Sequence, residues 1–403
     1  MRRRRVKVTG VGPVTPAGIG RAAFEAGIQE SISRIKRFDR LGPDWGPFIA
    51  AEVDDDEISR LVNRRELPNH LARHSLLGAI AGVLAVRDAG IEVSEIQRAN
   101  PAVITGTSIM DFGGINRELE SVAEKGVKGI IPRLIYTVSV ANVGSAIAEA
   151  LRVNARSLAV QSSCCSGLDA IGRGAAMVAN GEADVVIAGG SEAPLFKHPL
   201  LEFRRVNLTP STWDNAAEHC RPFDLWRTTG TVSEGAAMFV LEPEDSPRPG
   251  YCFVDGYAFA NDTVGDVCSG MEAAMADALA DARLRADDID VINAWAPGHT
   301  TIDAAEARLI KKVFGSRADE ILTHSIKGAL GNALGGAPAM QAAASALGLR
   351  GQYVPPSVNW EFPDPGCPLR ISSNLEYFNH DHVIINAHGI AGMNTSLVVS
   401  RCK

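Results

Sequence analysis

The sequence predicts an α/β fold built as two similar halves. Short runs rich in β-branched residues alternate with longer alanine-rich runs of helical periodicity along all 403 residues. Buried strands separated by helices are typical of α/β proteins. The same alternation starts again after a proline-containing segment at about 243–250. We therefore divide the chain into an N-terminal half, residues 1–248, and a C-terminal half, residues 249–403.

Each half contains four expected strands and three expected helices. In the first half we expect strands at 6–9, 102–105, 157–161 and 184–188, and helices at 68–89, 142–152 and 166–180. In the second half we expect strands at 252–258, 290–294, 321–324 and 382–387, and helices at 270–283, 303–313 and 333–348.

A short internal repeat supports the two halves. Residues 86–96 and 279–289 match at a constant offset of 193 residues, each where a helix ends before a strand. Such self-similarity is the mark of a duplicated unit. A chance match between two amphipathic helices that end in polar turns is the alternative.

Composition excludes several classes of partner. The mixture of 46% hydrophobic and 22% charged residues is that of a globular protein with a sizeable core. The net charge of −7, without a basic stripe interleaved with aromatics, argues against nucleic acid. The run 2–5 of four arginines is the exception, either a solvated leader into the first strand or a contact for an anionic partner such as a carrier protein. Residues 6–10, directly after the arginines, turn polar too soon for a secretory signal, and no apolar run is long enough for a membrane span.

Seven cysteines, an odd number without a CxxC pair, favour a reducing cytoplasm and no structural metal. Asp54, Asp55 and Asp56 are expected to form a solvated turn or a helix start. Cys164 and Cys165 are neighbours and cannot both face one pocket. We expect one to be a candidate reagent and the other to pack as a small apolar residue.

The segment around Cys164 has the pattern of a nucleophile turn. Residues 157–172 are expected to form a strand, a tight turn at 162–167 and a helix with one apolar face. The positive end of a helix lowers the pKa of a nearby thiol and prepares it to attack a thioester. Ser162, Ser163, Ser166 and Gly167 are small enough to let a substrate approach. From this pattern alone, a buried core cysteine is the alternative.

Several motifs then carry a family resemblance along almost the whole chain. Residues 8–18 resemble the opening strand and loop of type II β-ketoacyl-acyl-carrier-protein synthases. The Ser-Ser-Cys-Cys-Ser-Gly stretch at 162–167 is similar to their Thr-Ala-Cys-Ala-Ser-Gly turn. Further matches lie at 181–192, 221–224, 234–235 and 354–356. The chain is identified as a divergent member of this family, which belongs to the thiolase superfamily.

The resemblance implies a thiolase fold, in which duplicated βαβαβαββ halves form a five-layer αβαβα sandwich, and a dimer. It gives Cys164 the role of the nucleophile that takes an acyl chain before decarboxylative condensation with a malonyl group. It implies no cofactor of the protein's own, because the substrates arrive on the phosphopantetheine of acyl carrier protein or on CoA.

Both histidines of the family are replaced. The first histidine motif aligns on 293–299, with Trp295 at the histidine, and the second aligns on 325–332, with Asn332 at the histidine and Lys327 retained. Indole has one donor and no basic site, and an amide cannot shuttle a proton near neutral pH. Loss of acid–base help typically slows a reaction by about 10²–10⁴-fold. We therefore expect ordinary elongation to be slow or absent.

The same motif supplies supporting residues. Asp303 and Glu306 align with the family's acidic pair. The resemblance implies an ion pair between Glu306 and Lys327 beside the pocket, with a catalytic role as the alternative for these two residues. Pro297 and His299 replace two threonines that bind the phosphopantetheine arm, which puts the usual mode of arm binding in doubt.

The C-terminal loop 386–394 resembles the family's Asn-Ser-Phe-Gly-Phe-Gly-Gly-Thr-Asn. By that match the Ile390 amide joins the Cys164 amide as an oxyanion hole, worth about 3–4 kcal/mol per donor. Ile390 stands where the family has its gating phenylalanine, and Asn394 supports the pocket. His388 and His299 are candidate compensating bases, with a structural or surface role as the alternative for each.

Two functions follow. The chain is an acyltransferase of fatty-acid or polyketide biosynthesis that captures an acyl group on Cys164, or a non-catalytic partner resembling a chain-length factor, paired with a complete ketosynthase. The dimer is accordingly a homodimer or a heterodimer. A pocket filled by Trp295 and residues near Ile390 favours the silent partner, and an open pocket that reaches the sulfur favours the enzyme.

Overall fold

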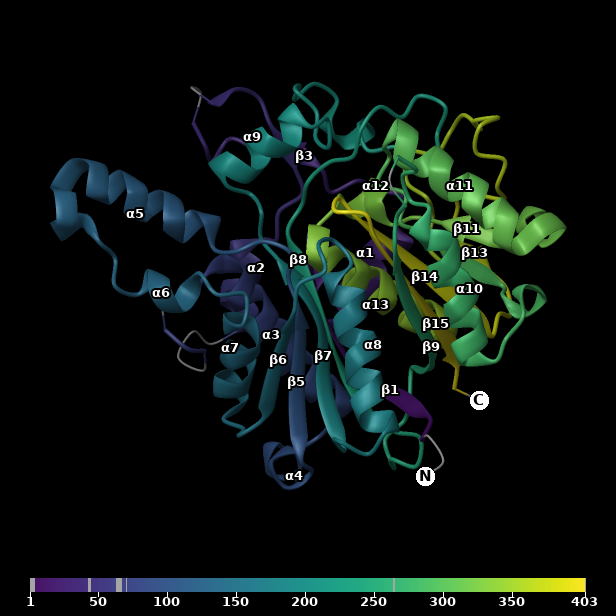
Figure 1. The fold of residues 1–403 in the computed structure, drawn as a ribbon, viewed down its shortest axis with the longest axis horizontal. Coiled ribbons are helices and arrows are strands. Elements are labelled where there is room, and N and C mark those ends of the chain that lie inside the picture. Colours follow the sequence, from purple (N-terminus) through teal and green to yellow (C-terminus); the bar gives the residue numbers. More distant parts are fainter. Residues whose placement is uncertain (1–3, 43–44, 63–66, 70, 264, 403) are drawn as a thin grey trace.

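The structure, a computed structural model, describes residues 4–42, 45–62, 67–69, 71–263 and 265–402. Within these residues one sheet of 11 strands runs through the molecule (Figure 1). The first half contributes β1 (Val6–Thr15), β5 (Pro101–Gly106), β6 (Arg156–Val160), β7 (Val185–Glu192) and β8 (Gly235–Pro243). The second half contributes β9 (Cys252–Asn261), β10 (Val291–Asn293), β11 (Leu322–His324), β14 (His382–Gly389) and β15 (Met393–Arg401).

The two halves have the same strand order. The first reads β6-β5-β7-β8-β1 and the second reads β11-β10-β14-β15-β9. In each, three strands are parallel and the last hairpin strand is antiparallel to its neighbours. The halves join where β1 pairs antiparallel with β9. The predicted α/β fold with duplicated βαβαβαββ halves is confirmed.

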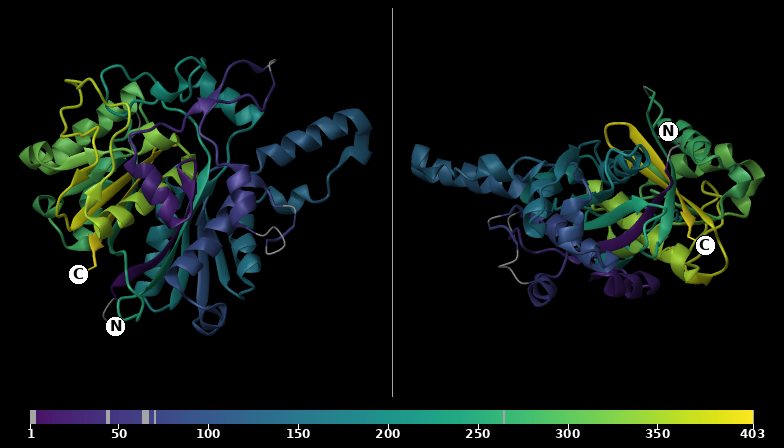
Figure 2. Two further views of the ribbon diagram at one scale, coloured as in Figure 1. Left: turned by 180° about the vertical axis from the view of Figure 1, so that it is seen from behind. Right: turned by 90° about the horizontal axis from the view of Figure 1, so that it is seen from below.

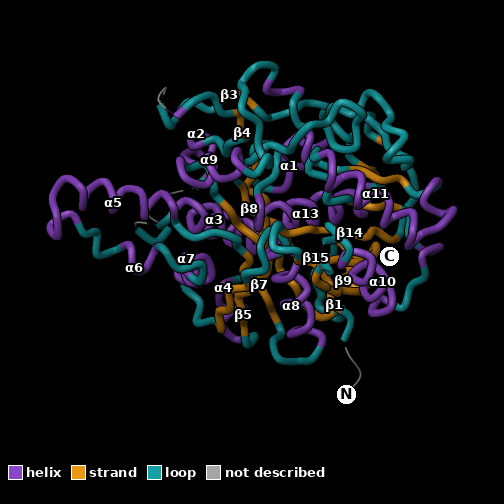
Figure 3. The backbone as a smooth tube through the Cα atoms, turned by 45° about the horizontal axis from the view of Figure 1, so that its top comes forward, coloured by secondary structure: helices purple, strands orange, loops and turns teal. Residues whose placement is uncertain are grey.

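Helices separate and cover the two halves of the sheet. α3 (Arg73–Ala89) and α7 (Asn142–Leu151) pack on the first half, and α10 (Gly270–Ala282) and α11 (Thr300–Phe314) flank the second. α8 (Ser166–Ala179) and α13 (Ala337–Gly351) lie between them and contact strands of both halves. Figures 2 and 3 show this arrangement of helices around the strands. The turn that contains Cys164 leads directly into α8, so the site lies where the halves meet.

The internal repeat appears again in the packing of α3 and α10. A Cβ on Gly10 of β1 would lie 2.2 Å from the Ala85 carbonyl oxygen and 2.8 Å from the Ala89 Cβ. A Cβ on Gly256 of β9 would lie 2.1 Å from the carbonyl oxygen of Ala278 and 2.8 Å from the Cβ of Ala282. These alanines are related by the same offset of 193 residues as the sequence match. The repeat therefore describes two equivalent helix–strand contacts, which argues against a chance match.

Some elements differ from the prediction. α3 begins at Arg73 because Ala72 is extended, with φ −61° and ψ 155°, and α13 begins after a 3₁₀ turn at Leu334–Gly336. β8 and β15 are two further strands that were not predicted, and both of their faces are buried. The remaining elements are β2 (Gly18–Ile19), α1 (Arg21–Gln29), β3 (Lys36–Arg37), β4 (Ile49–Ala50), α2 (Asp55–Leu61), α4 (Val93–Arg98), α5 (Phe112–Lys125), α6 (Leu134–Thr137), α9 (Lys197–Arg205), α12 (Lys327–Leu330), β12 (Tyr353–Val354) and β13 (Glu376–Tyr377).

Two charged runs have defined positions. Asp54 caps α2, because its carboxylate accepts the amides of Asp56 and Glu57, so the helix-start alternative is confirmed. Arg4 donates to the carbonyls of Val178 and Ala183, and Arg5 pairs with Asp255 at 2.8 Å. Arg2 and Arg3 lie outside the described residues. Arg4 and Arg5 thus bind the start of β1 to the end of α8 and to β9.

The described residues contain no helix with the length and apolar composition needed to cross a lipid bilayer.

Burial of His74 predicts a pH-dependent loss of stability. His74 lies at the start of α3, is 3% exposed, and its Nε2 has no partner among the described residues. Burial lowers the pKa of His74 from 6.5 to about 4, while Asp111 opposes the shift. Between these two pH values the His74 imidazole is protonated in the unfolded chain and neutral in the folded chain. The free energy of unfolding therefore contains the full contribution of neutral His74 above pH 6.5. It decreases as the pH falls from 6.5 toward 4.

We expect the stability difference between the wild type and a His74→Met variant to shift by about 2 kcal/mol against the wild type between pH 7 and pH 5. Urea unfolding of both proteins at the two pH values measures it. An unchanged difference would mean that His74 has the same pKa in the folded and the unfolded protein.

Candidate active site

The nucleophile turn lies between β6 and α8. Ser163 adopts the left-handed conformation with φ +55°, which reverses the chain directly before Cys164. The turn is closed by the Cys165 amide donating to the Ser162 carbonyl at 3.1 Å and by the Ser166 hydroxyl donating to the Ser163 carbonyl at 2.5 Å. α8 begins at Ser166. Cys164 is therefore held just before the helix N-terminus, as predicted from the sequence.

Of the two neighbouring cysteines, only Cys164 lines the cavity. Cys165 is fully buried, and its thiol donates to the carbonyl of Met393 at 3.3 Å. Cys164 is 8% exposed and faces a cavity of about 430 Å³. The expectation that one cysteine packs and the other faces a pocket agrees with this geometry.

The cavity brings together most of the residues that the sequence singled out. Cys164, Trp295, His299, Asn332, His388 and Ile390 all line it. The rest of the wall is mainly apolar: Phe203, Val206, Leu208, Val232, Val267, Pro297, Ile302 and Leu334. The lining segments come from both halves of the chain. Lys327, Glu306, Asp303 and Asn394 lie behind this wall and support it.

The Ile390 amide faces the cysteine sulfur. β14 ends at Gly389, where a Cβ would lie only 2.8 Å from the Ser163 Cβ and 3.3 Å from the Cys164 nitrogen. This close approach turns the backbone N–H of Ile390 toward the Cys164 sulfur, where it favours the thiolate. The Ile390 side chain is 60% exposed and leaves the cavity open. The arrangement suits the predicted oxyanion hole, whose role stays a prediction.

Burial opposes the low pKa that the helix N-terminus predicts for Cys164. Burial raises the pKa of Cys164 to about 12, and the Glu192 carboxylate adds to the shift, while the Ile390 amide, Ser163 and Lys327 oppose it. A helix N-terminus stabilises an anion by about 2 kcal/mol at most, which corresponds to roughly 1.5 pKa units. Burial therefore outweighs the helix, and the thiol needs a base to take its proton.

Lys327 binds groups other than the predicted partner. Its ammonium lies 4.0 Å from the centroid of the Trp295 ring and donates to the Gln341 side-chain oxygen at 2.9 Å. Lys327 and Trp295 are 1% and 2% exposed. Burial lowers the pKa of Lys327, while Glu306 opposes this. The indole that replaces the family's histidine thus covers one face of the buried cation.

Glu306 holds the backbone of the segment that carries Trp295. Its two carboxylate oxygens accept the amides of Trp295 at 2.9 Å and Ala296 at 2.7 Å, and Asn386 donates to it at 3.2 Å. Although both residues are described, no contact within 4.0 Å pairs Glu306 with Lys327. Glu306 and Lys327 therefore interact without a direct contact: each charge favours the charged form of the other, while backbone amides bind Glu306 and the indole and Gln341 bind Lys327.

Asn332 presents a donor to the cavity. Its backbone is fixed between Thr231 and Ser233, at 2.7 Å and 3.0 Å. Its side-chain oxygen accepts the amide of Leu334 at 3.2 Å, which leaves the side-chain NH₂ as the available group. The two positions that hold histidine in the family therefore carry donors without a basic site.

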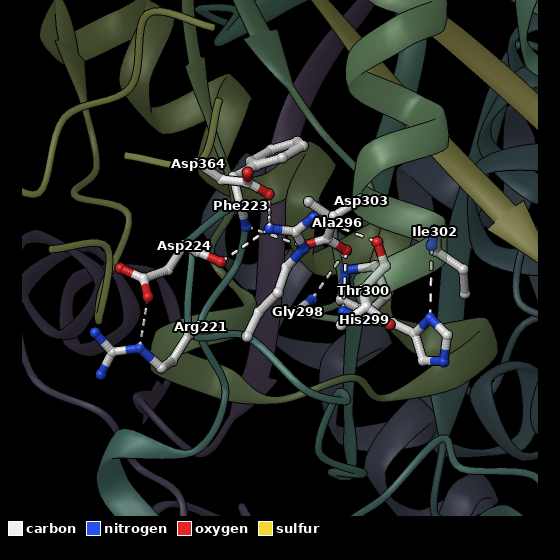
Figure 4. A network of polar contacts seen from close by, with 12 residues as sticks. Arg221, Phe223, Asp224, Ala296, Gly298, His299, Thr300, Ile302, Asp303 and Asp364 are labelled. Carbon is white, nitrogen blue, oxygen red and sulfur yellow. Dashed lines mark hydrogen bonds and ion pairs between the residues drawn. The ribbon is translucent and has the colours of Figure 1, made fainter. Parts of the chain in front are cut away.

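Asp303 and His299 belong to one network of polar contacts, and His299 of this network lines the cavity (Figure 4). The Asp303 carboxylate accepts the amides of Phe223, Gly298 and His299 at 2.9, 3.2 and 3.1 Å. The Nδ1 atom of His299 accepts the amides of Thr301 and Ile302, so this residue caps α11.

The capping contact decides the chemistry of His299. Because its Nδ1 lone pair is occupied, the neutral ring carries its proton on Nε2. Burial, with Arg227 nearby, lowers the pKa of His299. We therefore interpret His299 as a hydrogen-bond donor, and the prediction that it is a compensating base is not supported by this geometry.

Sequence reasoning missed three polar residues beside the site, of which Gln341 and Glu192 are buried. Gln341 binds Lys327 from α13, and Asp262 binds Asn394 from the end of β9. Glu192 ends β7, where Thr107 donates to it at 3.0 Å and the Ser108 amide at 2.6 Å, and burial raises the pKa of Glu192 to about 7. The Gly-Gly-Ser-Glu end of an apolar strand was the available signal for Glu192. Within the described residues, no group of three or more His, Cys, Asp or Glu side chains has the arrangement of a metal site.

Comparisons with known proteins cover the whole chain. Residues 3–246 match the model of the β-ketoacyl synthase N-terminal domain, and residues 251–361 match that of the C-terminal domain. The chain is 30% identical over 420 residues to the tetracenomycin polyketide synthase ketoacyl synthase alpha subunit of Streptomyces glaucescens, with 99% of this chain and 98% of that protein covered.

Solved structures agree with this result. The ishigamide ketosynthase/chain length factor has a TM-score of 0.91 at 26% identity, over 100% of both chains. A type II polyketide ketosynthase in complex with its acyl-carrier protein has a TM-score of 0.90 at 24% identity, over 99% of this chain and 100% of that one, and shares the fold. This chain belongs to the β-ketoacyl synthase family.

Proposed function

We propose that this chain is an acyltransferase of fatty-acid or polyketide biosynthesis that takes an acyl group from a thioester onto Cys164 and passes it to an acceptor. The observation that carries the proposal is the cavity of about 430 Å³, which reaches the Cys164 sulfur where the Ile390 amide also points. Trp295 lines this cavity and leaves it open. The open site favours an enzyme over a silent subunit.

The proposed capture step uses groups at the site in defined roles. The Cys164 thiolate attacks the carbonyl carbon of the incoming thioester, and the amides of Ile390 and Cys164 stabilise the oxyanion of the tetrahedral intermediate. The intermediate collapses to an acyl-Cys164 thioester and a free thiol on the carrier. In this proposal the acyl chain arrives on phosphopantetheine or CoA, and the apolar wall of the cavity accommodates it.

Decarboxylative condensation is expected to be impaired. Trp295 and Asn332 stand where the family has its two histidines, and each offers only a donor. His299 replaces a threonine in the cavity wall and also offers a donor, which suits contact with the amide oxygens of a phosphopantetheine arm. The site therefore supports acyl transfer better than the loss of carbon dioxide from a malonyl group.

A partner subunit and an acyl carrier protein complete the proposal. β6 is the last strand of the sheet, and Leu158 on it is 58% exposed. α5 and α6 extend away from the body of the protein (Figures 1 and 2). The segment 112–137 exposes apolar side chains: Leu119, Val127, Ile130, Ile135 and Tyr136. Open strand edges and exposed apolar surface are typical of subunit interfaces, so we infer a homodimer or a heterodimer with a second ketosynthase-like chain.

A second candidate function is that of a chain-length-factor-like subunit. The replacement of both histidines favours it, and one structural relative is described as a ketosynthase/chain length factor. In that case a complete ketosynthase supplies the chemistry and this chain shapes the space for the growing product. The open cavity at Cys164 is the observation against it.

Intact-protein mass spectrometry separates the two functions. The purified protein is incubated with a panel of acyl-carrier-protein and acyl-CoA thioesters, with and without a candidate partner ketosynthase, and Cys164→Ala serves as the control. We expect a mass increase equal to the acyl group in the wild type and none in the variant. No adduct under any of these conditions would favour the chain-length-factor function.

A further inference from the structure

A chain of three side chains ends at the cavity beside Cys164. Asp262 accepts the side-chain NH₂ of Asn394 at 2.6 Å, and the Asn394 oxygen lies 2.9 Å from Nδ1 of His388. Asp262 is itself fixed by the amides of Cys268 and Gly270, at 2.9 Å and 3.0 Å. His388 is 6% exposed and lines the cavity. The three residues therefore form a rigid support for one imidazole.

The chemistry of the neighbours determines the tautomer of His388. The Asn394 nitrogen lies among three acceptors: the Asp262 carboxylate and the carbonyls of Ala260 and Gly392. Only an NH₂ group suits this position, so the oxygen of the amide faces His388. Nδ1 must then carry the proton that it donates to this oxygen. In the neutral ring Nε2 is left with a free lone pair.

Other titratable groups near the thiol are already occupied. The Lys327 ammonium donates to Gln341 and lies against the face of the Trp295 ring. Glu192 accepts from Thr107 and Ser108. The Nδ1 lone pair of His299 accepts two backbone amides. Within the described residues, Nε2 of His388 has no partner and lines the same cavity as Cys164.

The backbone places His388 next to the nucleophile. Gly389, the following residue, lies against Ser163 and the Cys164 amide, since a Cβ there would approach these atoms to 2.8 and 3.3 Å. His388 and Asn394 are opposite each other in the β14–β15 pair. The imidazole is thus held between the Asn394 amide on one side and the cavity on the other.

We infer that His388 is the base that takes the proton of Cys164, and that Asn394 and Asp262 position it in the required tautomer. Nε2 accepts the thiol proton as the sulfur forms a bond to the carbonyl carbon of the thioester. When the bond between that carbon and the carrier sulfur breaks, the imidazolium returns the proton to the leaving thiolate. The products are acyl-Cys164 and a free carrier thiol, and neutral His388 is regenerated.

This inference rests on the proposed acyl capture by Cys164, and its test requires no thioester. Alkylation of Cys164 by iodoacetamide also needs the thiolate, and peptide mapping separates Cys164 from the other cysteines. We expect His388→Ala to slow alkylation of Cys164 by about 10²-fold at pH 7, in the range typical for a lost general base. Added imidazole is expected to restore much of the rate in this variant.

Further variants separate the base from a structural role. His388→Gln keeps a polar side chain at the same place without a base of useful strength and is expected to be as slow as the alanine variant. Asp262→Asn is expected to slow alkylation less, because it loosens the orientation of the imidazole and retains the ring. His382→Gln is the matched control, since His382 lies at the other end of β14 and bonds Ser400 in the same manner.

Each result bears on the inference. A wild-type rate in both His388 variants, an inert Cys164 in the wild type, or slow variants that imidazole does not accelerate would each overturn the role of His388. If alkylation depends on His388 and no thioester acylates Cys164, the result supports His388 as the base and contradicts the proposed function. If thioesters acylate the wild type and the His388 variants equally, the result supports the proposed function and contradicts the role of His388 as the base.

Discussion

Replacing Trp295 and Asn332 together by histidine is expected to raise the rate at which malonyl thioesters lose carbon dioxide by about 10²-fold or more. Both side chains line the cavity that contains Cys164, so two imidazoles there would face the same substrate. The Lys327 ammonium lies 4.0 Å from the present indole ring. A cation at that distance lowers the pKa of an imidazole and keeps it neutral, able to donate to the developing enolate.

Conversion of a malonyl to an acetyl carrier protein lowers its mass by one carbon dioxide, and mass spectrometry over time gives the rate. A double variant with Trp295→Phe and Asn332→Ala is the control, because it removes the same two side chains without adding an imidazole. Equal rates in the two double variants would mean that the replaced histidines are not what limits decarboxylation in this chain.

Substituting Gly389 by alanine is expected to slow acyl capture on Cys164 by about 10²–10³-fold, the usual effect of losing one oxyanion donor. A Cβ at Gly389 would lie 2.8 Å from the Ser163 Cβ, closer than the two atoms can approach. One of the two segments must move, which separates the Ile390 amide from the sulfur. The protein should remain folded, because the loop lies at the edge of the core, next to the exposed Ile390 side chain.

Ala391→Ser is the matched control for this change, since Ala391 is exposed two residues further along the same loop. The rate of acyl-adduct formation and the thermal midpoint should be measured for both variants. If Gly389→Ala acylates at the wild-type rate with an unchanged midpoint, the contact between the loop and the nucleophile turn does not position the oxyanion hole.

The fold and the nucleophile could be predicted from the sequence because their signals are local. Alternation of strands and helices gives the order of elements in each half, and the repeat at 86–96 and 279–289 relates the halves. Small residues around Cys164 mark the turn. α5 was missed although Phe112, Ile115, Leu119 and Val122 recur at helical spacing along it; this apolar stripe is largely uncovered, and among the residues of α5 only Gly113 and Gly114 are buried.

The sequence by itself determined the family, the duplicated fold, the position of Cys164 and the replacement of both histidines, since each depends on residues close together in the chain. Tertiary structure alone decided the charge and partners of these groups. Burial and Glu192 raise the pKa of Cys164. The Lys327 ammonium donates a hydrogen bond to Gln341. Asp262 and Asn394 orient His388. The Nδ1 atom of His299 accepts a backbone amide from the start of α11. Proton affinity and tautomer depend on solvent exclusion and on atoms supplied by distant segments, which local spacing does not encode.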